Sequence, residues 1–112
     1  MYVSITRLKI KSFWVLPNFS RLSGLIAKQA KESPGNLKVK LSNRWFRYFY
    51  TQTHWNSEEA MRQFMKGGEH KIAMKEWSKF AAEVKVYGFE TDEPPRWKDA
   101  RIMIENKGRL IG

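Results

Sequence analysis

Cysteine is absent from the sequence, and histidine occurs only at His54 and His70. Without cysteine the chain cannot form disulfides, supply a thiolate nucleophile or build a cysteine metal site. Two histidines alone fall short of the ligands of a structural zinc site, so no metal site is expected. The absence of these groups restricts any chemistry to oxygen and nitrogen side chains or to a bound organic molecule.

Long apolar runs are also missing. No stretch approaches the ~18 apolar residues that a membrane-spanning helix needs. The opening sequence MYVSITRLKIKSFWVLPNF is interrupted by lysines and an arginine, so it lacks the apolar core of a signal peptide. We therefore expect a soluble cytoplasmic protein with no membrane partner.

Positive charge is in excess, with 21 Lys plus Arg against 11 Asp plus Glu and a net charge of +10. Such a balance favours anionic partners, namely nucleic acid, phosphate or carboxylate ligands, or acidic membrane surfaces. The basic residues are spread over several segments, a pattern that is equally typical of a solvated surface. The charge therefore does not choose among these partners.

Periodicity predicts one small α+β domain within the 112 residues. Period-two patterns predict strands, and period-3.6 patterns predict helices. Pro17 fits the first turn of one helix. The glycine pair at 67–68 separates two helical pieces. The strands are expected at 2–10, 37–41, 43–55 and 84–90, and the helical pieces at 16–33, 56–65 and roughly 69–83. The order βαββαβ predicts a ferredoxin-like sandwich with two helices on one face of an antiparallel sheet. We take 1–90 as this domain and 91–112 as a C-terminal extension with a short helix that packs on the domain or on a partner.

The strand expected at 43–55 has aromatic residues on both faces, whereas a two-layer sandwich buries only one. They are Trp45, Phe49 and Trp55 at odd positions and Phe46, Tyr48 and Tyr50 at even positions. A second copy of the sheet could cover the other face in a symmetric dimer. Single-stranded nucleic acid could cover it instead, with bases stacked on the aromatic rings. Both alternatives remain open from the residues alone.

A family resemblance covers nearly the whole chain. The strongest similarity lies in residues 54–77, HWNSEEAMRQFMKGGEHKIAMKEW, with Trp55, Glu59-Ala60-Met61, Phe64, Gly68, His70 and Ala73-Met74. Two further similar segments lie near the ends of the chain, namely ITRLKIKSFWVLPNF and GFETDEPPRWKDARIMIENKGR. These segments resemble dimeric α/β-barrel proteins related to antibiotic-biosynthesis monooxygenases, in an uncharacterised bacterial branch. The resemblance implies a homodimer whose two sheets close into a barrel, with a pocket in each subunit between sheet and helices.

Relatives in this superfamily perform cofactor-independent oxygenation of polycyclic phenols, bind or degrade haem, or carry out chlorite and peroxide chemistry on haem. The haem-degrading relatives use an Asn on the first strand and a Trp and a His on the second helix. Here residues 2–10 contain no Asn, Phe64 stands where the Trp would be, and Met74 falls closer than His70 to the family's His. We therefore expect no cofactor, with haem as the alternative.

His70 is the candidate catalytic residue. In a helix over 69–83 it shares one face with Ala73, Met74 and Trp77, so its imidazole points inward or across a pocket mouth. It would act as a proton carrier or as an axial ligand of a planar cofactor; the alternative is a buried imidazole that hydrogen-bonds to backbone. The expected pocket-lining residues, suited to a flat hydrophobic ligand, are Thr6, Trp14, Phe64, Met74 and Trp77.

These observations predict a homodimeric protein that binds a hydrophobic and partly anionic small molecule. As a monooxygenase-like oxidoreductase it would oxidise that molecule. The alternative is a ferredoxin-like nucleic-acid-binding module that uses the aromatic, basic third strand. Steep weakening of binding with salt would indicate the second function.

Overall fold

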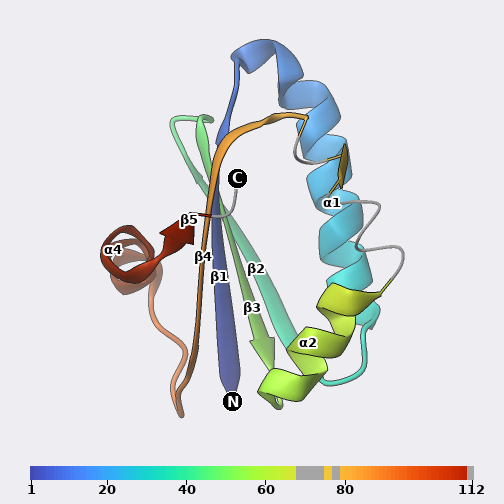
Figure 1. Cartoon of the computed structure of the whole chain (residues 1–112), viewed down its shortest axis with the longest axis vertical. Helices are drawn as coiled ribbons and strands as arrows, with labels where there is room; N and C mark the ends of the chain where they lie inside the picture. Colours follow the sequence, from blue (N-terminus) through green and yellow to red (C-terminus); the bar gives the residue numbers. More distant parts are fainter. Residues whose placement is uncertain (68–74, 77–78, 111–112) are drawn as a thin grey trace.

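One antiparallel sheet runs through the molecule, with helices on both of its faces (Figure 1). The structure is a computed structural model and describes residues 1–67, 75–76 and 79–110. The sheet order is β2-β3-β1-β4-β5, and the strands are β1 (Tyr2–Ile10), β2 (Asn36–Arg44), β3 (Tyr48–Trp55), β4 (Ala81–Glu90) and β5 (Arg109–Leu110). The helices are the 3₁₀ helix η1 (Phe13–Val15), α1 (Leu16–Glu32), α2 (Glu58–Lys66) and α4 (Trp97–Lys107). The order β2-β3-β1-β4 is ferredoxin-like, so the predicted α+β class is confirmed.

The central strand β1 is buried on both faces, as its sequence allows. Leu8 and Ile10 point toward α1 and pack with Phe19 in one core cluster. Val3 and Ile5 point the other way and pack in a second cluster. Because successive side chains of a strand alternate between faces, one strand supplies both cores.

Helices α1 and α2 form where the sequence predicts them and cover one face of the sheet (Figure 1). Pro17 occupies the first turn of α1, where the missing N–H costs nothing. Ser57 caps α2, because its Oγ accepts a hydrogen bond from the backbone N–H of Ala60 at 3.2 Å. No helix in the described part of the chain is both long and apolar enough to cross a membrane.

The predicted strand 43–55 is wrong at its beginning. Residues 36–44 continue as β2, the chain reverses at 45–47, and β3 begins only at Tyr48. Of the predicted helical piece 69–83, residues 69–74 and 77–78 lie outside the described residues, residues 75–76 are helical, and residues 81–83 are already part of β4. The aromatic residues at 45–46 and the alanines at 81–82 carry no turn signal, so the sequence pattern does not show these two boundaries.

Helix α4 covers the second face of the sheet. Ala100 and Ile104 of α4 are fully buried against the cluster of Val3, Ile5 and Tyr50. The ring of Trp97 meets the ring of Tyr50 edge-on, with centroids 6.4 Å apart. The chain's own C-terminal helix therefore covers part of the face for which the sequence suggested a second copy or nucleic acid.

An ion-pair cluster connects α4 to the sheet. The guanidinium of Arg7, which is 5% exposed, pairs through Nη1 with Oε1 of Glu105 at 2.6 Å and through Nη2 with Glu83. Lys85 Nζ lies 3.5 Å from Oε2 of Glu105. The paired carboxylates compensate the buried charge of Arg7, which would otherwise be costly.

Candidate functional site

A cavity of about 700 Å³ lies between the sheet and helices α1 and α2; we call it the sheet cavity. Its walls come from β1, β3 and β4 below, from α1 and α2 above, and from the C-terminal segment at one end. The volume falls in the range of small-molecule sites, which bury a ligand in an apolar space with a few placed polar groups.

Hydroxyl groups form the floor of the sheet cavity. The strand register places Thr53 beside Ser4, and Thr51 beside Thr6 in the next row. Thr53 Oγ1 accepts a hydrogen bond from Trp55 Nε1 at 2.8 Å. A hydroxyl can donate and accept, so this floor can hydrogen-bond to carbonyl, hydroxyl or phenol groups of a ligand.

The roof of the sheet cavity is apolar. It is formed by Ile26, Ala27 and Ala30 of α1 and by Met61, Phe64 and Met65 of α2. The rings of Phe64 and Trp55 lie 5.4 Å apart at 32°, which connects roof to floor at one end. Flat apolar surfaces with soft methionine side chains suit a planar hydrophobic molecule.

Basic side chains line the rim of the sheet cavity. They are Arg62, Lys66, Lys107 and Arg109, and no carboxylate occurs among the described lining residues. Arg62 is engaged with Glu58 at 3.4 Å. Arg109 reaches this place because β5 pairs with β4 and sets Arg109 beside Val86. The rim therefore favours a ligand that carries negative charge.

Tyr2 adds a phenol to the floor. Gly88 makes room for it, since a Cβ at this position would lie 2.8 Å from Tyr2 Cζ and still closer to the hydroxyl. Burial, and after it the charge of Glu58, raises the pKa of Tyr2 above its ordinary value. The phenol therefore stays protonated at neutral pH and can donate a hydrogen bond into the cavity.

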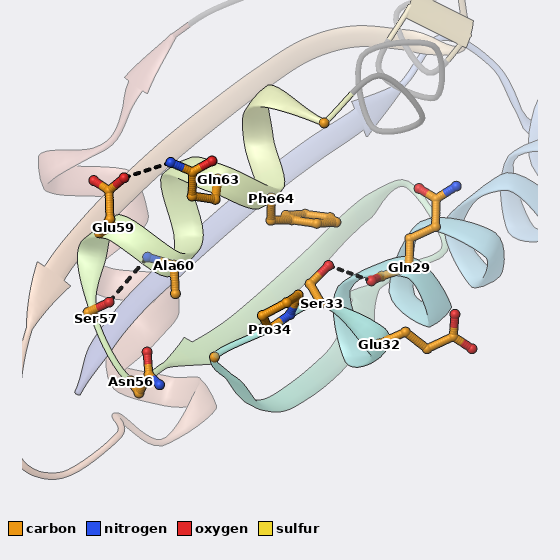
Figure 2. A pocket seen from close by; sticks show the side chains of 12 residues that line it. Gln29, Glu32, Ser33, Pro34, Asn56, Ser57, Glu59, Ala60, Gln63 and Phe64 are labelled. Atoms are coloured by element: carbon orange, nitrogen blue, oxygen red, sulfur yellow. Dashed lines mark hydrogen bonds between the residues drawn. The ribbon is translucent and has the colours of Figure 1, made fainter.

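A second, more open hollow of about 870 Å³ lies between the C-terminal end of α1 and α2 (Figure 2). Polar residues such as Gln29, Glu32 and Gln63 line it together with apolar surface, and Gln63 donates to Glu59 at 2.7 Å. Phe64 lines this hollow as well as the sheet cavity. The two hollows therefore adjoin at Phe64.

The structure places the predicted pocket residues differently. Thr6 and Phe64 both line the sheet cavity. Trp14 does not: it belongs to η1 beyond the end of β1 and is 93% exposed. His70, Met74 and Trp77 lie outside the described residues, so the roles predicted for them stay predictions.

His54 lies on the opposite face of the sheet and is buried there. Its Nε2 lies 2.5 Å from Oε1 of Gln52. Burial, followed by the charges of Lys40 and Lys38, lowers its pKa, so the imidazole is neutral at pH 7. Among the described residues no group of three or more His, Cys, Asp or Glu is placed to hold a metal ion.

Sequence pattern missed the basic rim, because Lys107 and Arg109 come from the C-terminal extension, far from the other lining residues in sequence. It also missed the hydroxyls of Thr51 and Thr53. The alternation of threonines in the third strand was the one available signal for them.

Comparisons with known proteins find the same fold in several solved structures. No protein-family model matches the chain, and no curated protein matches it. A candidate antibiotic biosynthesis monooxygenase from Deinococcus radiodurans is 19% identical with a TM-score of 0.76, covering 86% of this chain and 97% of its own. A second from Nitrosomonas europaea is 14% identical with a TM-score of 0.76, covering 83% and 100%.

SnoaB, a cofactor-independent oxygenase from Streptomyces nogalater, is 10% identical with a TM-score of 0.74, covering 83% of this chain and 94% of its own. At these identities the likeness is one of fold. The chain thus has the fold of the antibiotic biosynthesis monooxygenase-like proteins, as its sequence resemblance predicted.

Proposed function

We propose that this protein binds a flat, hydrophobic, negatively charged small molecule in the sheet cavity. The single observation that carries the proposal is the composition of the cavity wall: an apolar roof, a hydroxyl floor and a rim with cations and no carboxylate among its described residues. Each part selects one property of the ligand, namely a planar apolar body, hydrogen-bonding groups and an anionic group.

Oxygen-dependent oxidation of that molecule is the second candidate function. It is supported by the fold shared with SnoaB, which is described as a cofactor-independent oxygenase. In this proposal the hydroxyl floor orients an activated phenol or related group, and His70 moves the proton. In this proposal the active form is a homodimer, and no cofactor takes part.

A nucleic-acid-binding role fits the described residues less well. Tyr50 on β3 is 5% exposed because Trp97, Ala100 and Ile104 of α4 cover it. Trp45 and Phe46 lie in the turn and not on the sheet. The third strand therefore presents no flat row of rings on which successive bases could stack.

A matched pair of fluorescent dyes tests the binding proposal. 1-Anilinonaphthalene-8-sulfonate carries a sulfonate, and N-phenyl-1-naphthylamine is the same aromatic body without it. Replacing Ala27, a buried roof residue, by Phe should abolish binding of both dyes, because the larger ring fills the cavity. The Lys107→Gln, Arg109→Gln double variant should weaken only the sulfonate dye, by about fivefold for exposed charge interactions.

Arg21→Gln provides the matched control, since Arg21 is an exposed arginine of α1 outside the cavity lining. It should leave both affinities unchanged. If the Ala27→Phe variant keeps its helical circular dichroism and still binds both dyes, the dyes bind elsewhere and the sheet cavity is not the ligand site.

A further inference from the structure

The turn between β2 and β3 has an unfavourable composition for its shape. Arg47 N donates to Arg44 O at 3.2 Å across a turn whose two central residues are Trp45 and Phe46, and Arg47 completes the three-residue connection between β2 and β3. These two residues have φ angles of 56° and 51°. Two successive left-handed residues are typical of the tight hairpin turn that Asn-Gly normally occupies, because bulky side chains are sterically strained there.

Packing within the chain does not explain the strained pair. The side chain of Trp45 is 71% exposed and that of Phe46 is 61% exposed. The guanidinium of Arg44 lies over the Trp45 ring, 4.6 Å from its centroid. Strain held at an exposed aromatic pair suggests a function that needs these rings at the surface.

A second exposed aromatic pair lies at the same end of the sheet. Ile10 N at the end of β1 donates to Arg47 O at 3.0 Å, so the first residues after β1 begin beside the turn. Phe13 and Trp14 follow in η1 and are 55% and 93% exposed. Figure 1 shows η1 and the β2–β3 turn at the same, upper end of the sheet. We call Phe13, Trp14, Trp45 and Phe46 together the aromatic end.

The two segments that carry the aromatic end contain charges of one sign. Segments 9–18 and 43–48 contain Lys9, Lys11, Arg44 and Arg47 and no Asp or Glu. Aromatic rings next to arginine and lysine suit the boundary of a lipid bilayer, where tryptophan favours the interface and cations are attracted to anionic headgroups. The hollow beside the turn, which Arg44 and Trp45 line, also contains the carboxylate of Glu105, and this charge disfavours a nucleic-acid backbone there.

We propose that the aromatic end docks on an anionic lipid surface, with Trp45 and Phe46 inserted at headgroup depth. This function is separate from the ligand site proposed above and does not depend on it. The expectation of no membrane partner rests on the lack of a long apolar run in the sequence. Peripheral docking needs no membrane-spanning helix, so that expectation does not apply to it.

Co-sedimentation with large unilamellar vesicles tests the proposal. The protein should bind vesicles of phosphatidylcholine with phosphatidylglycerol and bind far less to vesicles of phosphatidylcholine alone, and its tryptophan emission should shift to the blue on binding. The double variant Trp45→Asn, Phe46→Gly supplies the residues that the turn prefers, so it should unfold at the same or a higher temperature. Its affinity for the anionic vesicles should fall at least about tenfold through loss of the inserted rings.

Leu37→Ser is the matched control, because Leu37 is 57% exposed and lies at the opposite end of the sheet, next to Asn36, which pairs with Trp55. This variant should bind vesicles as the unmodified protein does. The proposal is overturned if the unmodified protein does not sediment with anionic vesicles, or if the Asn-Gly variant sediments equally well. It is also overturned if the Asn-Gly variant changes only the oligomeric state, since the aromatic end would then bind a second copy of the chain.

Discussion

Replacing Ile104 by Ala tests whether α4 is docked on its own sheet in solution. Ile104 is fully buried in the cluster that contains Val3, Ile5, Tyr50 and Ala100. Ile102, two residues earlier in the same helix, is 52% exposed. The two isoleucines therefore form a matched pair of identical substitutions on opposite sides of one helix.

The expected magnitudes follow from burial. Removing a buried isoleucine side chain beyond Cβ costs about 2–5 kcal/mol of unfolding free energy, since the lost contacts leave a cavity. Alanine favours helix over isoleucine by a few tenths of a kcal/mol, about equally at both positions. Ile104→Ala should therefore lower the unfolding free energy by about 3 kcal/mol, and Ile102→Ala should change it by less than about 0.5 kcal/mol.

Urea denaturation provides the measurement. All variants are compared at one protein concentration, because the apparent stability of a protein that assembles depends on its concentration. Circular dichroism at 222 nm reports the helices, and tryptophan emission includes Trp97, whose ring contacts Tyr50. With an m-value of about 2 kcal/mol per molar urea, the midpoint of Ile104→Ala should fall by roughly 1.5 M. Equal midpoints for the two variants, within about 0.3 M on that slope, would show that α4 does not rest on this face.

Two further predictions follow from His54 and Ser57. Because burial and then Lys40 and Lys38 lower the pKa of His54, the fold favours its neutral form. Above pH ~6.5 the His54 imidazole is neutral in both the folded and the unfolded chain, so its burial carries no protonation penalty. As the pH falls below that value, the unfolded chain binds a proton that the folded chain does not. The unfolding free energy then falls by at most about 1.4 kcal/mol per pH unit. Thermal melts should therefore show a smaller loss of stability between pH 7 and pH 5 for His54→Gln than for the unmodified protein; equal losses would contradict this account. Ser57→Ala removes the N-cap of α2 and should cost about 1 kcal/mol in urea unfolding, while Ser57→Asp, which can accept the same hydrogen bond, should cost little.

The elements that the sequence predicted well have strong periodicity. β1 alternates apolar residues over Tyr2–Ile10 and fills a core on each face, and α1 repeats Phe19, Ile26 and Ala30 on its buried side. Such patterns determine both the type of element and its orientation. The first strand and the first helix of the βαββαβ order followed from such patterns.

The turn between β2 and β3 could not be predicted in this way. Trp45 and Phe46 are strong strand formers, and neither supplies the positive φ that a tight hairpin needs. Local preference therefore extended the strand through the reversal. Tertiary pairing of β3 with both β1 and β2 overrides that preference.

The candidate site was predictable in part. Thr6 and Phe64 follow from a resemblance that places a pocket between sheet and helices, and both line the sheet cavity. Arg109 is placed at its rim by the two-residue strand β5, which is too short to show any periodicity. The sequence predicts Trp14 as a pocket residue because it does not distinguish an exposed tryptophan from a buried one.

Helix α2 covers the sheet cavity without contributing a fully buried residue to the core. Its contacts with the sheet include the Phe64–Trp55 ring pair, in which Trp55 is buried and Phe64 is only half-buried. A roof of this kind can open locally at a much smaller free-energy cost than unfolding of the sheet. Entry and release of a ligand would then share one gating step, so a change in the first turn of α2 alters both rate constants by the same factor. How long a molecule stays bound would be set by residues that never touch it, at an unchanged Kd.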